Sequence, residues 1–170
     1  MAAAINSNPL KANAAMFELS LINAETSGAS FDDIMVEALK RGIPPEIATR
    51  LSEILQKAWT IGGELVSVGK IIVTKIMDFL AANPKIAIGT ALGACAATLV
   101  ASVPFIGPML APLAASICMV YGAGVGAAAQ AGDYSMSPVS AAFELARKFF
   151  ELIISIFNGV KEYWVARGEA

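Results

Sequence analysis

The sequence predicts an all-α fold, in which a bundle of amphipathic helices surrounds a central hydrophobic helical hairpin. Two observations carry this prediction. Apolar residues recur at helical spacing along most of the chain, and no segment is predicted to be a strand. Residues 86–132 form an unbroken run of 47 positions without a charged side chain. At 170 residues the whole chain has the size of one domain.

The composition is unusually apolar for a soluble protein. Hydrophobic residues make up 56% of the chain and charged residues 15%, whereas soluble domains carry about a quarter charged residues. We therefore expect much of the surface to face lipid or other copies of the chain. The net charge of −2, without a clustered basic face, argues against a nucleic-acid partner.

Helix-start signals divide the chain. An N-cap residue followed by proline occurs at Asn8-Pro9, Asn83-Pro84 and Ser137-Pro138. Residues 1–45 are predicted to form short helices, the first over about residues 9–23. The second starts at Ser30, where Asp33 completes an approximate capping box, and ends before Gly42.

Residues 46–83 are predicted to form one long amphipathic helix. Its apolar residues follow one another in steps of four and three: Ile47, Leu51, Ile54, Ala58, Ile61, Leu65, Val68 and Ile72. Gly62-Gly63 interrupt this stripe and predict a bend or a break. Packing within the monomer is the favoured interpretation of the stripe, and coiled-coil pairing with another subunit stays open.

Residues 137–167 are predicted to form a C-terminal amphipathic helix. Its middle, over residues 149–157, is nearly all apolar. Tyr163 and Trp164 lie toward its end, where amphipathic aromatic residues favour a boundary between apolar and wet surroundings.

Residues 84–132 are predicted to form a transmembrane helical hairpin. A charged residue at the centre of a span costs about 2.5–3.5 kcal/mol on insertion, which explains a run free of charge. The run is too long for one span of about 20 residues and suits two. The predicted arms cover residues 86–103 and 109–131. The predicted turn is marked by Pro104, Gly107, Pro108 and Pro112, which interrupt regular helix.

Small residues recur every fourth position on both arms, the small-xxx-small pattern that lets helices approach closely in lipid. They are Gly89, Gly93, Ala97 and Ala101 on the first arm and Ala114, Cys118, Gly122 and Gly126 on the second. The pattern does not decide whether the packing partner is the other arm or another subunit.

The first arm is only mildly hydrophobic. Its strongly apolar residues favour insertion by about 2–4 kcal/mol in total, so the hairpin can be held in a soluble or assembled form and then released into lipid. In the order and size of its segments, the chain resembles the pore-forming domains of colicin-type toxins. In those domains amphipathic helices sheathe an apolar hairpin.

We therefore expect a membrane-associated protein that inserts into a lipid bilayer, forms a homo-oligomer and permeabilises the membrane as a pore. The alternative is a non-catalytic structural or scaffold subunit that oligomerises in or on a membrane. A soluble carrier with an apolar cavity is a third interpretation.

No enzymatic activity is expected. The chain has no histidine, and its two cysteines, Cys95 and Cys118, lie in the apolar run. The sequence thus predicts no catalytic residues, no cofactor and no metal. No secretory signal peptide is expected either.

Overall fold

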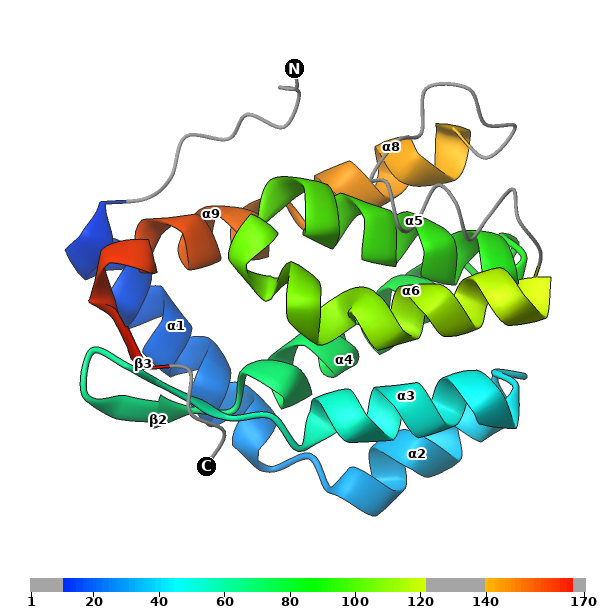
Figure 1. The fold of residues 1–170 in the computed structure, drawn as a ribbon, viewed down its shortest axis with the longest axis horizontal. Coiled ribbons are helices and arrows are strands. Elements are labelled where there is room, and N and C mark those ends of the chain that lie inside the picture. The colour runs from blue at the N-terminus through cyan, green and yellow to red at the C-terminus, as the bar shows by residue number, and fades with distance from the viewer. Residues whose placement is uncertain (1–10, 122–139, 167–170) are drawn as a thin grey trace.

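The computed structural model describes residues 11–121 and 140–166, and these residues fold into a helical bundle with a small sheet at one corner (Figure 1). The predicted all-α fold is confirmed. The helices are α1 (Ala12–Ser27), α2 (Phe31–Lys40), α3 (Pro45–Leu55), α4 (Val68–Ala82), α5 (Ile88–Ser102), α6 (Gly107–Tyr121), α8 (Ser140–Phe149) and α9 (Glu151–Gly159). Two 3₁₀ turns, η1 (Pro104–Ile106) and η2 (Lys161–Tyr163), accompany them.

Neighbouring helices form a row in the order α2, α3, α6, α5 and α8 (Figure 1). Helix α4 lies behind this row and packs on α3 and α5, while α1 packs on α9 and α4. The two arms of the hairpin, α5 and α6, therefore lie in the interior of the row.

The N-terminal helices form close to where the sequence places them. The Oγ of Ser30 accepts a hydrogen bond from the backbone N–H of Asp33 at 2.9 Å, so the predicted cap of α2 is confirmed. Gly42, with φ of +90°, turns the chain after α2, and Pro45 is the first residue of α3. Helix α1 starts at Ala12, and the predicted start at Asn8-Pro9 lies outside the described residues.

The predicted long helix over 46–83 is wrong. The chain there forms α3, a β-hairpin of β1 (Trp59–Ile61) and β2 (Glu64–Val66), and then α4. Gly62 and Gly63 have φ of +60° and +86° and form the two-residue turn between paired Ile61 and Glu64. Positive φ at both positions suits a type I′ turn, which matches the twist of the flanking strands. The apolar residues at 58, 61, 65 and 68 keep the spacing of a helix, but the chain between α3 and α4 forms this hairpin.

Asn83-Pro84 marks a boundary, but it ends a helix and does not start one. The Nδ2 of Asn83 donates to the carbonyl oxygen of Phe79 at 3.0 Å and so caps the C-terminus of α4. Helix α5 starts four residues after Pro84, at Ile88.

The predicted C-terminal helix over 137–167 is also wrong. Within the described residues, Phe150 separates α8 from α9, and α9 ends at Gly159. The chain then forms η2 and β3 (Trp164–Ala166), which pairs with β1 to complete an antiparallel sheet of order β2-β1-β3. The expected aromatic end of the helix is therefore part of this corner, where the hydroxyl of Tyr163 donates to Asn13 Oδ1 at 2.6 Å.

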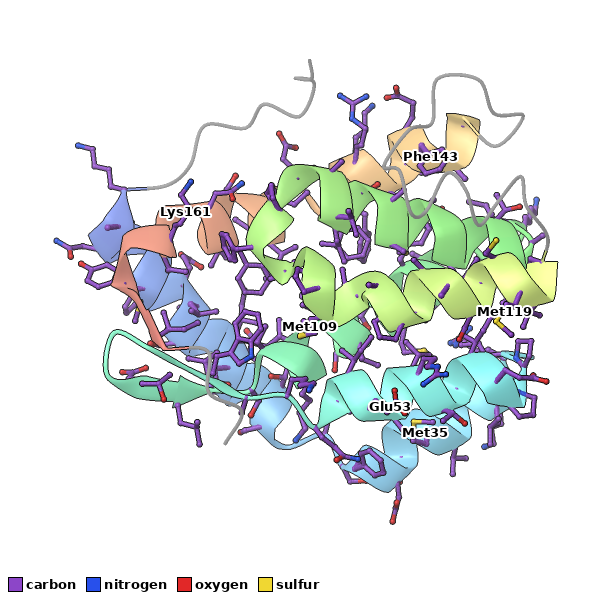
Figure 2. All side chains as sticks on the ribbon, viewed as in Figure 1. Met35, Glu53, Met109, Met119, Phe143 and Lys161 are labelled. Atoms are coloured by element: carbon purple, nitrogen blue, oxygen red, sulfur yellow. The ribbon has the colours of Figure 1, made fainter. Side chains whose placement is uncertain are left out.

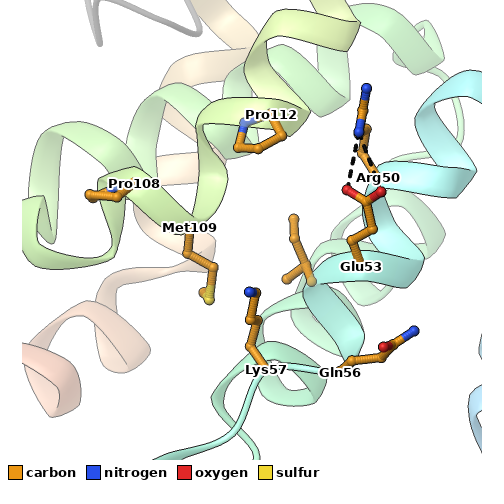
Figure 3. Close-up of a pocket in the computed structure, with 8 residues that line it drawn as sticks. Arg50, Glu53, Gln56, Lys57, Pro108, Met109 and Pro112 are labelled. Carbon is orange, nitrogen blue, oxygen red and sulfur yellow. Dashed lines mark hydrogen bonds and ion pairs between the residues drawn. The ribbon is translucent and has the colours of Figure 1, made fainter. Parts of the chain in front are cut away.

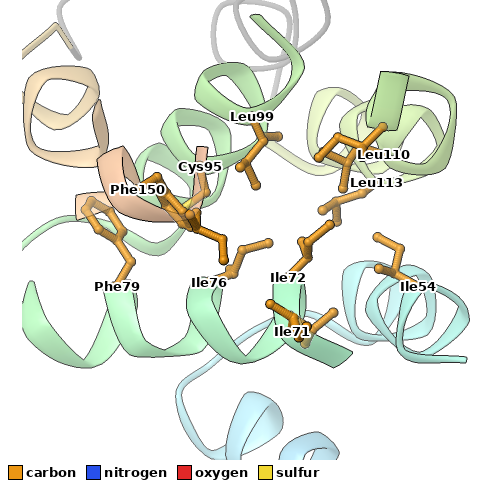
Figure 4. Packing of buried hydrophobic residues seen from close by; sticks show 14 of the residues in the cluster. Ile54, Ile71, Ile72, Ile76, Phe79, Cys95, Leu99, Leu110, Leu113 and Phe150 are labelled. Carbon is orange, nitrogen blue, oxygen red and sulfur yellow. The ribbon is translucent and has the colours of Figure 1, made fainter. Parts of the chain in front are cut away.

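The core is one continuous apolar cluster with α5 at its centre. Every residue from Ala91 to Leu99 is buried. Ile72 and Ile76 of α4 point toward this helix and toward α6 (Figure 4). Glu53 and Lys161, by contrast, are exposed to solvent; both are labelled in Figure 2. The stripe residues of α3 are buried within the monomer, so packing inside one chain accounts for that part of the stripe.

Candidate membrane-inserting hairpin

The two arms of the hairpin differ in length. Helix α5 has 15 residues in place of the 18 expected for the first arm. At 1.5 Å per residue it reaches about 22 Å, less than a hydrocarbon core of about 30 Å. The segment Pro104–Tyr121 has 18 residues with a mean hydropathy of 1.6, and within the described residues it is the one helical segment long and apolar enough to cross a bilayer. The expected continuation of the second arm over 122–131 lies outside the described residues.

The turn between the arms is shorter than the sequence predicted. Val103 leaves helical geometry, with φ of −132° and ψ of 76°, and Pro104 opens the 3₁₀ turn η1. Gly107 and Pro108 are already the first two residues of α6. Proline is tolerated there because its missing N–H would have no partner within the helix.

Pro112 was predicted as part of the turn, and this is wrong because it lies inside α6. Its ring removes the hydrogen bond that the carbonyl of Pro108 would accept. Both prolines are exposed, so water can satisfy that carbonyl and the helix continues.

The predicted small-residue positions fall in different surroundings. Gly89, Gly93, Ala97 and Ala114 are buried, Cys118 is half-buried, and Ala101 is exposed. Gly122 and Gly126 lie outside the described residues. The arms approach closely at Gly89, where an added Cβ would lie 2.5 Å from Cδ1 of Tyr121. This close approach is therefore between a glycine and an aromatic ring, and small-residue packing along the remaining positions stays a prediction.

Helix α5 is sheathed almost completely. It packs against α4, α6 and α8, and its residues over 91–99 are buried on every side. The hydroxyl of Thr98 is buried and has no hydrogen-bond partner among the described residues. Helix α8 is amphipathic and packs on α5. Its buried residues include Ala142, Phe143 and Ala146.

Within the described residues, hydrogen bonds from Arg50 and Asn158 connect the hairpin to surrounding elements. The Nε of Arg50 in α3 donates to Ser116 Oγ in α6 at 3.2 Å. The Nδ2 of Asn158 in α9 donates to the carbonyl oxygen of Ser102 at 3.1 Å, near the turn. Apolar contacts make up most of the remaining interface, as the core cluster shows.

The outer face of α6 is exposed but carries no charge. This uncharged face consists of Pro104 in the preceding turn η1 and of Pro108, Ala111, Pro112, Met119 and Val120 in α6. Met119 is 82% exposed and projects from the C-terminal end of the helix (Figure 2). A helix on the surface of a soluble protein normally presents charged and polar residues to water. An exposed apolar surface of this kind is typical of protein–protein or membrane contacts.

A groove lies between the packed helices α3 and α6, beside this face (Figure 3). Its volume is about 460 Å³, and α6 lines it with Pro108, Met109 and Pro112. The opposite wall carries charged side chains of α3 and the following turn. These charges are Arg50 and Glu53 on α3 and Lys57 in the turn after it. Their helical spacing at 50, 53 and 57 was the signal available for a shared site.

Cys95 and Cys118 are free thiols, the first buried and the second half-buried. Across residues 11–121 and 140–166, no three His, Cys, Asp or Glu side chains gather as a metal site would require. In comparisons with known proteins, the chain matches no protein-family model, no curated protein and no solved structure.

Proposed function

We propose that this chain is a membrane-inserting protein that stores an uncharged helical hairpin inside a closed bundle, delivers it into a bilayer, self-associates there and permeabilises the membrane. The observation that carries the proposal is the uncharged face of α6, which is exposed although residues 91–99 of the neighbouring α5 are all buried.

The way the hairpin is held supports release into lipid. Its interface with α3, α4 and α8 is largely apolar, and acyl chains provide an equally apolar environment for the same side chains. The bonds from Arg50 and Asn158 must break. A neutral hydrogen bond contributes about 0.5–1.5 kcal/mol and one to a charged group about 1.5–3 kcal/mol. These two hydrogen bonds therefore add only a few kcal/mol to the free energy needed to release the hairpin.

The sheath helices suit the membrane surface after release. Helix α8 exposes Lys148 on its polar side and carries Arg147, half-buried and ion-paired with Glu144, beside the side that covers α5 with Phe143 and Ala146. An amphipathic helix with a net positive charge and one apolar face suits the interfacial plane of a bilayer. Since no charge lies in the 47-residue run, the expected permeation path is unselective.

Aspartate on the uncharged face provides the test. Ala111 is exposed in the closed bundle and lies near the middle of Pro104–Tyr121. Ala111→Asp should therefore leave the water-soluble fold intact. In lipid the charge costs about 2.5–3.5 kcal/mol, so the equilibrium constant for insertion should fall by about two orders of magnitude. Val36→Asp is the matched control, because Val36 is a 50% exposed apolar residue on a helix outside the hairpin.

Flotation with liposomes and leakage of trapped dye measure the outcome. The wild-type chain and Val36→Asp should float and release dye, and Ala111→Asp should do neither. If Ala111→Asp matches the wild type, the hairpin does not enter the bilayer. A wild-type chain that never floats refutes membrane insertion altogether.

A membrane scaffold is the second candidate function. Exposed apolar residues also occur away from the hairpin, on α1 at Phe17 and Leu21 and on α2 at Val36 and Leu39. Such surfaces favour assembly with other protein chains. The scaffold is favoured if the wild-type chain forms large regular assemblies and releases no dye. In that case Val36→Asp should break up the assemblies and Ala111→Asp should leave them intact.

A further inference from the structure

The groove between α3 and α6 combines positive charge with an apolar wall. Arg50, Glu53 and Lys57 supply two positive charges and one negative charge, which leaves a net charge of +1. Ile54, Pro108 and Met109 provide apolar contacts (Figure 3). Its volume of about 460 Å³ falls within the range of about 300–1,000 Å³ typical of small-molecule sites.

The two cations differ in how they are engaged. The Nη1 of Arg50 pairs with the carboxylate of Glu53 at 3.2 and 3.3 Å, and its Nε donates to Ser116. Arg50 is thereby held in place at one end of the groove. Lys57 is half-buried, and its ammonium group extends from the other end toward Met109 (Figure 3). Lysine acts as a point charge for phosphate, while arginine offers planar donors.

The geometry points to a binding site for the phosphate of an anionic phospholipid, held by Lys57, with the acyl chains directed along the uncharged face of α6. This inference rests on the proposed function and names the lipid class that the protein recognises. Charge complementarity supports an anionic headgroup, because Glu53 is already paired with Arg50 and leaves Lys57 to attract the ligand. The apolar wall formed by the hairpin itself favours a lipid over a free phosphate ion.

Such a site orients the protein before insertion. Pro108 and Pro112 line the groove and also belong to the uncharged face. A headgroup bound in the groove therefore places the exposed side of the hairpin against the bilayer. Anionic lipid then raises the local concentration of the chain at the surface where insertion occurs.

Methionine methyl groups give a direct readout of the groove. Met109 lines it, whereas Met35 lies on α2 and does not. The protein with ¹³C-labelled methionine methyl groups is titrated with dihexanoyl phosphatidylglycerol below its micelle concentration, and in separate arms with dihexanoyl phosphatidylcholine and inorganic phosphate. We expect saturable shifts of Met109, without shifts of Met35, for phosphatidylglycerol only. Equal saturation by inorganic phosphate or by phosphatidylcholine, or no shift of Met109, overturns the inference.

Lys57→Gln should weaken the binding of phosphatidylglycerol by about tenfold or more, because it removes a charge-assisted contact. Lys40→Gln is the matched control, since it changes the net charge equally on an exposed residue of α2. Equal effects of the two variants would mean that only overall charge matters, and this too overturns the site.

Vesicle experiments separate this inference from the proposed function. Insertion that is equal in neutral and anionic vesicles, with no response of Met109, refutes the groove and leaves the hairpin proposal standing. Saturable binding at Met109 without insertion into any vesicle refutes the hairpin proposal and leaves the site.

Discussion

Gly69 is the second residue of α4 and packs directly against the end of α3, which makes its replacement by alanine a stringent test of the fold. Its backbone N–H donates to the carbonyl oxygen of Lys57 at 3.0 Å. An added Cβ would lie 1.6 Å from the carbonyl oxygen of Ile54, where ordinary contacts begin near 3.4 Å. The neighbour is backbone, so side-chain rotation offers no relief. The two helices must separate by about 1.8 Å.

The expected cost of Gly69→Ala combines two terms. Overpacking of this kind costs about 1–3 kcal/mol, and weakening the bond to Lys57 adds about 0.5–1.5 kcal/mol. We therefore expect the free energy of unfolding to fall by about 2–4 kcal/mol. For a chain of this size, that corresponds to a loss of roughly 5–15 °C in Tm.

Urea unfolding followed by far-ultraviolet circular dichroism measures this effect. Gly28→Ala is the matched control, because Gly28 has φ of −79° and an added Cβ would have no atom within 4 Å. That variant should be neutral or more stable by about 0.4–1 kcal/mol. A free energy of unfolding for Gly69→Ala within about 0.5 kcal/mol of wild type, the scatter of neutral surface changes, would refute the packing of α3 on α4 described above.

Four further substitutions test other elements by the same unfolding measurement. Thr98→Val should stabilise the chain by about 1 kcal/mol by removing a buried hydroxyl that has no partner among the described residues; a loss would show that the hydroxyl is satisfied. Gly89→Ala should cost about 1–3 kcal/mol through its clash with the ring of Tyr121, and combination with Tyr121→Ala should cancel part of that cost. Gly63→Ala should cost about 1–2 kcal/mol because its φ is +86°, whereas an equal cost in Gly63→Asn would argue against backbone strain. Ser30→Ala should cost about 1 kcal/mol by removing the cap of α2, and no change would mean that water replaces that bond.

Local signals predicted the helices well where the apolar period and the caps agreed. The start of α2 at Ser30 followed from its side chain and its spacing to Asp33. The hairpin of β1 and β2 was missed although Gly62-Gly63 lie between aromatic and β-branched residues, which is itself a hairpin signal. A period of four and three across short runs does not distinguish a helix from two strands.

Pairing between strands far apart in the chain could not be predicted from local sequence patterns. Strand β3 exists because Trp164 pairs with Ile61, about a hundred positions earlier in the chain. The groove likewise depends on Lys57, in the turn after α3, and on Met109 in α6, which come together only in the folded bundle. The charged residues of α3 were visible in the sequence, but their apolar counterpart across the groove was not.

The sequence by itself determined a helical protein with an uncharged proline-broken hairpin, because charge, helical period and proline act locally. It did not distinguish the two arms, which are similarly apolar. Tertiary structure alone decided that α5 is enclosed by α4, α6 and α8 while α6 keeps one face exposed. The physical reason is that burial depends on which helices pack on each arm, and those neighbours come from distant parts of the chain.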